Sequence, residues 1–119
     1  MSDLASTVRA FTALVAKFQY EQAHDEFYDE QLVKHENEDA PTIGLAQHRQ
    51  EMKQFLTDIS NASARLLQVV ISDDMSVCEW HYQFDHQHWG HRNFREISVQ
   101  RWRDGRIIHE RHHYKTATW

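Results

Sequence analysis

The 119-residue chain contains little cysteine, proline or glycine, with one Cys, one Pro and three Gly. The single cysteine, Cys78, excludes an internal disulfide, so nothing in the sequence requires an oxidising compartment. The scarcity of Pro and Gly, together with 40% hydrophobic and 26% charged residues, excludes collagen-like, low-complexity and disordered chains. The length leaves room for a single domain over residues 1–119.

Long apolar runs are also absent. No stretch approaches the length that crosses a membrane, and the N-terminus lacks a basic head followed by an unbroken apolar segment. We therefore expect a cytoplasmic protein that does not bind membranes. The formal net charge is −5 with histidine neutral, and Lys and Arg form no dense patch, so nucleic acid is not an expected partner either.

Histidine, in contrast, is abundant. Most of the ten histidines lie between His81 and His113, and histidine titrates near neutral pH, moves protons and binds metals. His86 and His88 project to the same side of a strand, which is competent spacing for two metal ligands. A metal site needs more ligands and a supporting shell, which the spacing does not provide. We expect no metal here, and instead exposed histidines that tune solubility or a dimer contact.

Helical spacing dominates the first half of the chain. Apolar residues at intervals of three and four predict an amphipathic helix over residues 3–20, a short helix over 21–28 and a third over 45–59. Residues 31–36 are short enough for a strand or an extended connection. Residues 37–44 are acidic and contain the only proline, which predicts a loop.

In the second half of the chain, apolar and polar residues alternate with a period of two. Strands are predicted at residues 65–71, 76–89 and 94–103, and the Asp104-Gly105 hairpin turn leads into a strand over 106–114. The last five residues, 115–119, have no clear period. Helices followed by a meander of strands predict an α+β domain with its helices on one face of an antiparallel sheet.

The direction in which strand 94–103 faces stays open. Facing inward, Glu96, Ser98 and Gln100 would be polar groups converging in a cavity, the usual composition of a ligand site. Facing outward, they would be the solvated face of a half-buried strand. Hydrophobicity alone would turn Ile97 and Val99 inward. The conflict disappears if helices cover one face and a partner subunit covers the other.

The order of these elements and four sequence phrases resemble the SnoaL-like branch of the nuclear transport factor 2-like superfamily. The phrases are Phe27-Tyr-Asp-Glu-Gln-Leu-Val-Lys-His-Glu, Gly44-Leu-Ala-Gln-His-Arg, Val77-Cys-Glu-Trp and Val99-Gln-Arg-Trp-Arg-Asp-Gly-Arg-Ile-Ile-His-Glu. The resemblance covers nearly the whole chain and implies a cone, in which a curved antiparallel sheet wraps N-terminal helices around an apolar pocket. In that superfamily, pairs of cones commonly dimerise through the sheet. Its members include ketosteroid isomerases, polyketide cyclases, epoxide hydrolases, dehydratases and proteins that only bind or scaffold.

The resemblance also implies which residues of this chain occupy the catalytic positions of ketosteroid isomerases. His35 falls where ketosteroid isomerases carry the carboxylate that moves the proton, and an imidazole can do the same. The alternative for His35 is a partly exposed strand-end histidine with no task. Phe11 replaces a hydrogen-bonding tyrosine of those enzymes, and Ser98 replaces a protonated acid. Losing one oxyanion donor typically costs about 3 kcal/mol, so true ketosteroid isomerase activity is disfavoured.

We therefore expect a homodimeric cone that binds a small apolar molecule and uses no cofactor. In an enzymatic version, His35 abstracts or relays a proton, and Ser98 or Tyr82 donates to the incipient negative charge, as in an isomerase, cyclase or dehydratase. The alternative is a non-enzymatic interaction or scaffold module of the same fold, whose His- and Arg-rich sheet face serves self-association or docking. The residues expected to contact the ligand are Phe11, Val15, Tyr28, Trp80 and Trp102.

Overall fold

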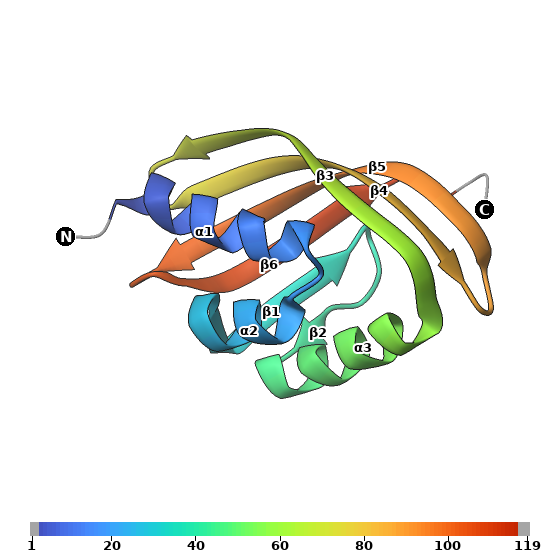
Figure 1. The fold of residues 1–119 in the computed structure, drawn as a ribbon. Coiled ribbons are helices and arrows are strands. Elements are labelled where there is room, and N and C mark those ends of the chain that lie inside the picture. Colours follow the sequence, from blue (N-terminus) through green and yellow to red (C-terminus); the bar gives the residue numbers. More distant parts are fainter. Residues whose placement is uncertain (1–2, 117–119) are drawn as a thin grey trace.

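The computed structural model describes residues 3–116. In this part of the chain three helices and six strands form one α+β domain, with the helices on the concave side of a curved sheet (Figure 1). None of the helices in residues 3–116 has both the length and the apolar composition of a membrane-spanning helix. In chain order the elements are α1 (Leu4–Ala16), α2 (Tyr20–Phe27), β1 (Tyr28–Glu36), β2 (Thr42–Ile43), α3 (Leu45–Asp58), β3 (Ile59–Ser72), β4 (Met75–His86), β5 (Gly90–Arg103) and β6 (Arg106–Tyr114).

Helix α1 begins at a capped turn and ends earlier than its periodicity predicts. The side chain of Asp3 accepts a hydrogen bond from the backbone N–H of Ala5, which satisfies one of the free donors at the helix start. The helix stops before Phe18, whose φ of 57° ends the predicted helix 3–20 early, and α2 corresponds to the short helix predicted over 21–28. The buried residues Val8 and Phe11 lie one turn apart and turn the apolar face of α1 toward the sheet.

The sheet has the strand order β2-β1-β6-β5-β4-β3. Strands β3 to β6 form the predicted antiparallel meander, but β1 runs parallel to β6, so the sheet is mixed rather than wholly antiparallel. Strand β3 begins at Ile59, well before Arg65, where the apolar pattern starts. Its first half is polar and exposed, and so carries no alternation, yet it pairs with β4 from Ile59 opposite His86 onward.

The predicted hairpin turn at Asp104-Gly105 is confirmed. Both residues have positive φ, 52° and 77°, as a two-residue hairpin loop of this type requires. The turn fixes the register of β5 against β6, so that Gln100 lies opposite Glu110 and Ser98 lies opposite His112. The polar residues of the two strands therefore meet in pairs on the concave face.

Strand β5 presents its polar side to the interior. Glu96, Ser98 and Gln100 are buried, whereas Ile97 on the outer face is 37% exposed. This settles the direction that the alternation left open, in favour of the orientation that the family resemblance implied for Ser98. The concave face of the sheet thus combines polar groups from β5 and β6 with the aromatic side chains of β4.

Candidate functional site

A cavity of about 380 Å³ lies between the helices and the concave face of the sheet, within the usual size range of small-molecule sites. Its walls are mostly aromatic, and its ionisable groups come from β1, α3, β5, β6 and the loop after β1. The rings that line it are those of Phe11, Tyr20, Tyr28, His48, Phe55, Trp80, Tyr82, Phe84, Trp89, Phe94, His112 and Tyr114.

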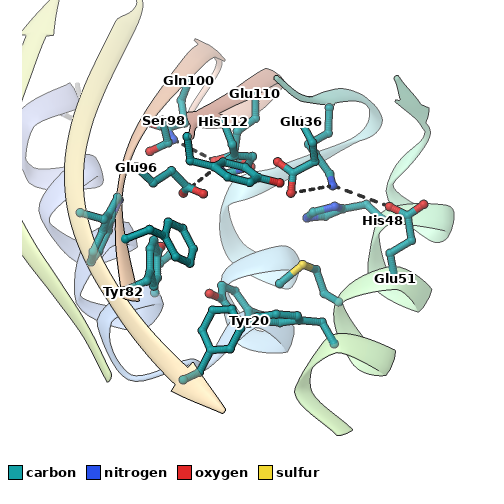
Figure 2. A pocket seen from close by; sticks show the side chains of 18 of the residues that line it. Tyr20, Glu36, His48, Glu51, Tyr82, Glu96, Ser98, Gln100, Glu110 and His112 are labelled. Atoms are coloured by element: carbon teal, nitrogen blue, oxygen red, sulfur yellow. Dashed lines mark hydrogen bonds and ion pairs between the residues drawn. The ribbon is translucent and has the colours of Figure 1, made fainter. Parts of the chain in front are cut away.

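His112 lies between two carboxylates in the wall of this cavity (Figure 2). Its Nδ1 is 3.1 Å from Oε2 of Glu96, and its Nε2 is 3.4 Å from Oε1 of Glu110. Burial alone would lower the pKa of His112, but the charges of the two glutamates and its hydrogen bonds to them raise that pKa well above its ordinary value. His112 is therefore an imidazolium that donates from both nitrogens.

Glu110 is a buried carboxylate with donors on both oxygens. The hydroxyl of Tyr28 donates to Oε1 at 2.6 Å, and Nε2 of Gln100 donates to Oε2 at 2.8 Å. Burial would raise the pKa of Glu110, but the charge of His112 and the hydrogen bonds from His112 and Tyr28 hold it at about 2. Glu110 therefore stays ionised at neutral pH and anchors the imidazolium.

Behind this centre, a chain of hydrogen bonds fixes Gln100. Ser76 donates from Oγ to Oε1 of Gln100 at 2.7 Å, and Nε1 of Trp102 donates to Ser76 at 2.9 Å. Nε2 of Gln100 also donates to Oγ of Ser98 at 3.0 Å. Each partner is buried, so the wall that presents Glu110 is rigid.

Glu36 ends β1 on another side of the cavity. Its Oε1 lies 3.8 Å from Nζ of Lys34, which also lies 3.7 Å from Oε1 of Glu51. Oε2 of Glu36 is buried without a hydrogen-bond partner among the described residues. Burial raises the pKa of Glu36, and the charges of His112 and Lys34 lower it by less. Glu36 is therefore the carboxyl of this cavity that is best suited to exchange a proton.

Two phenols face the same space. Figure 2 shows Tyr20 and Tyr82 across the cavity from Glu36. Burial raises the pKa of both hydroxyls, and the charge of Glu96 raises them further. Both side chains therefore keep their protons, and since a side-chain hydrogen bond joins the two hydroxyls, they present a linked pair to a ligand oxygen.

The structure brings together most of the residues that the sequence analysis named. Trp102 is the exception among the expected ligand contacts, because its ring lies deeper in the core, edge to face with Phe11 at 5.6 Å, and does not line the cavity. The named residues that do line the cavity are Phe11, Val15, Tyr28, Trp80, Tyr82 and Ser98.

His35 does not line the cavity. In β1 it is opposite Arg111 of β6, whereas its neighbour Glu36 is opposite His112. Because successive side chains of a strand point to opposite faces, Glu36 enters the cavity and His35 lies on the outer face, with its ring 5.2 Å from that of His109. The expectation that His35 and Ser98 look into one pocket is therefore wrong.

The charged centre on β6 was not predicted. Nothing in the sequence distinguishes Glu110, and His112 is only one of the several histidines between His81 and His113. The signal that would have found both is the register set by the Asp104-Gly105 turn, which places them opposite Gln100 and Ser98. The other histidines do not assemble a metal site, since no group of three or more potential ligands occurs among residues 3–116.

Comparison with protein families gives one match over most of the chain. The model of the SnoaL-like polyketide cyclase family matches residues 6–119. No curated protein matches the chain.

Solved structures of the same fold are numerous. A candidate SnoaL-like polyketide cyclase from Mesorhizobium loti is 15% identical, with a TM-score of 0.83 over 95% of this chain and 100% of that one. An NTF2-like protein of unknown function from Burkholderia pseudomallei is 14% identical, with a TM-score of 0.82 over 99% and 95%. A protein with a ketosteroid isomerase-like fold from Catenulispora acidiphila, in complex with trimethylamine, is 14% identical, with a TM-score of 0.74 over 89% and 85%. At these identities the likeness shows the fold alone.

Proposed function

The chain belongs to the SnoaL-like polyketide cyclase family, and on that basis we propose that its cavity binds a small, mainly apolar molecule and catalyses cofactor-independent proton transfer of the isomerase, cyclase or dehydratase type. One observation carries the proposal. Glu36, whose pKa is raised by burial, lies across a cavity of about 380 Å³ from the neutral phenols of Tyr20 and Tyr82. A base with a poised pKa and donors for a developing oxyanion are the two parts that enolisation requires.

Glu36 acts as the base. Its carboxylate accepts a proton from a C–H group next to a ligand carbonyl, and the electron pair of that bond moves onto the carbonyl oxygen to form an enolate. The protonated carboxyl then returns the proton to another carbon, or the enolate carbon attacks a second carbonyl and closes a ring, and the carboxyl gives its proton to the alkoxide that this attack creates. A carboxyl with a raised pKa serves both steps because it is a stronger base than an ordinary glutamate and remains an acid afterwards.

The hydroxyls stabilise the enolate oxygen. Tyr82 takes the donor role expected from the sequence, Tyr20 supplies a second phenol, and Ser98 adds a hydroxyl to the same cavity. The aromatic walls exclude water, which strengthens each of these hydrogen bonds. The roles of Tyr82 and Ser98 thus remain part of the proposal, while the base moves one residue along β1, from His35 to Glu36.

The experiment compares two adjacent residues on opposite faces of β1. Incorporation of solvent deuterium next to the carbonyl is followed by NMR for a panel of small cyclic ketones and 1,3-diketones. We expect exchange catalysed by the wild type to fall by about 10²–10⁴-fold in Glu36→Gln, since removing a general base has effects of that size. His35→Gln, the matched control, keeps the wild-type rate. Full activity in Glu36→Gln would contradict the assignment of the base.

A second property, self-association, is favoured by the outer face of the sheet. Val70 and Ile97 are 59% and 37% exposed there, and Val77 and Val99 pair between their strands. An apolar surface on an otherwise polar sheet face is typical of an interface. We propose that a second copy covers it, as a homodimer that forms with or without catalysis, in the cytoplasm, where the free, buried Cys78 stays reduced.

A further inference from the structure

The ionisable groups of the cavity are unbalanced in sign. Five of its lining residues are acidic, and Lys34 is the single Lys or Arg that lines it among the described residues. Lys34 lies between Glu36 and Glu51, and the imidazolium of His112 lies between Glu96 and Glu110. Each cation is thus already shared by two carboxylates. Over residues 3–116, the cavity therefore offers an anionic ligand no Lys, Arg or imidazolium that is not already shared between carboxylates.

The centre around His112 retains a negative charge. Two glutamates surround one imidazolium, and Glu110 is fully occupied by Tyr28 and Gln100 in addition to His112. Glu96 receives a hydrogen bond from Nδ1 of His112 at 3.1 Å, and Gln100 and Tyr28 are engaged by Glu110 instead. The uncompensated charge of the centre therefore resides mainly on Glu96, in an interior where water screens it poorly.

Aromatic rings frame Glu96 on the concave face. In the sheet register Glu96 lies opposite Trp80 on β4 and opposite Tyr114 on β6, and Phe94 lies two residues before it on β5. The rings follow one another in an arc, with centroid separations of 5.7 Å from Trp80 to Tyr82, 5.8 Å from Tyr82 to Phe94 and 5.5 Å from Phe94 to Tyr114. A buried carboxylate is thus surrounded by π-systems.

This combination selects for one sign of ligand charge. The faces of aromatic rings attract cations, most strongly where water is excluded, and the adjacent carboxylate adds a direct charge interaction. A neutral ligand gains neither effect, and an anion is repelled. Resting on the proposed function of the cavity as a ligand site, we propose that its ligands are organic cations, with an amine or quaternary ammonium group held by Glu96 within the arc of Trp80, Tyr82, Phe94 and Tyr114.

The cation site leaves the proton-transfer site free. Glu36 is opposite His112 on the neighbouring strand pair, whereas Glu96 contacts the other side of that imidazole. A ligand whose ammonium group is held at Glu96 can therefore place its apolar body toward Glu36 and Tyr20 (Figure 2). The ammonium group would serve to orient the part of the molecule that reacts.

Three probes with one skeleton test the proposal. They are 4-phenylbutylamine, protonated at neutral pH, the neutral 4-phenyl-1-butanol and the anionic 4-phenylbutyrate, each titrated against the full chain by calorimetry. We expect the amine to bind at least about tenfold more tightly than the alcohol, and the butyrate to bind most weakly. In Glu96→Gln the preference for the amine over the alcohol should disappear while the alcohol keeps its affinity.

Two further variants separate the site from general effects of charge and packing. Glu79→Gln removes a carboxylate from the outer face of β4, where it pairs with Arg95, and should leave the amine preference intact. Phe94→Leu should weaken binding of the amine more than binding of the alcohol, which tests the rings even if Glu96→Gln does not fold. Equal binding of the amine and the alcohol by the wild type overturns the inference but leaves the cavity a ligand site. Binding of none of the three probes overturns the inference and the proposed function together.

Discussion

The hydroxyl of Tyr28 donates a 2.6 Å hydrogen bond to the carboxylate of Glu110, and both side chains are buried. The bond joins the first residue of β1 to β6, across the parallel strand pair. It also supports the charge relationship in the cavity, because Glu110 can hold the imidazolium of His112 only while it is ionised. A contact that appears structural therefore controls the protonation of the site.

The first prediction follows from this bond. Tyr28→Phe removes a donor from a buried carboxylate, and we expect the free energy of unfolding to fall by about 1–3 kcal/mol. The pKa of Glu110 should rise from about 2, since Tyr28 is one of the groups that lower it. Urea denaturation at neutral pH measures the first effect and carboxyl NMR titration the second. An unchanged Glu110 titration would show that the hydrogen bond has no electrostatic role.

The second prediction concerns the buried pair His24 and His48, whose rings lie 4.8 Å apart. Burial lowers the pKa of His24 to about 4 and that of His48 to about 3, from 6.5. Below pH 6.5 both histidines are protonated in the unfolded chain but stay neutral in the folded protein. They therefore reduce the free energy of unfolding as the pH falls from 6.5 toward 3. Replacing His48 by Gln should make the free energy of unfolding fall less steeply with decreasing pH, when it is measured by urea denaturation between pH 3 and 7.

The matched control for that series is His88→Gln, because His88 is an exposed histidine in the β4–β5 turn. In this variant the free energy of unfolding should fall with decreasing pH as steeply as in the wild type. Equal slopes in the wild type and both variants would mean that the acid sensitivity arises elsewhere.

The third prediction tests the turn that sets the register of the site. Gly105 has a φ of 77°, a conformation that costs an alanine about 1 kcal/mol. Gly105→Ala should therefore lower the free energy of unfolding by about that amount. Gly105→Asn should lower it by less, since asparagine tolerates a left-handed backbone conformation. Thermal unfolding followed by circular dichroism ranks the three proteins. An alanine variant as stable as the wild type would contradict the strain argument.

The fourth prediction tests the outer face of the sheet. Ile97→Lys places a charge on the exposed apolar surface and should convert the proposed homodimer to a monomer, as measured by light scattering after gel filtration. Ile43→Lys is the control, because Ile43 is 65% exposed but lies on the short edge strand β2. A wild type that is monomeric at all concentrations would refute self-association through this surface.

The fold was largely predictable because its signals are local. The heptad-like spacing in α1, the alternation in β4 and the Asp104-Gly105 turn each involve residues close together in the sequence, and all three were confirmed. The pairing of β1 with β6 joins residues about eighty positions apart, such as Tyr28 and Glu110. No local pattern encodes such a pairing, and the sheet was therefore expected to be wholly antiparallel.

The site was less predictable because it depends on which side of each strand faces inward. The resemblance places the expected base at His35, whereas the residue that lines the cavity is its neighbour Glu36, since neighbouring side chains of a strand point to opposite faces. Strand β5 was ambiguous for a related reason: its polar residues are buried, against the hydrophobic preference, because partners on β4 and β6 satisfy them. Hydropathy cannot indicate burial that is compensated by hydrogen bonds.

The parallel pairing of β1 with β6 has a consequence for the order of assembly. The meander of β3, β4 and β5 can form from neighbours in sequence, but β1 has no place in the sheet until β6 has been made and has docked beside it. Glu110 and His112 arrive with that last strand. A nascent chain halted at the hairpin turn before it would have the helices, the curved meander and Glu96, but it would lack the two β6 residues that contact each other beside Glu96, His112 and Glu110. The charged wall of the cavity is therefore completed only when β6 docks and closes the sheet onto β1.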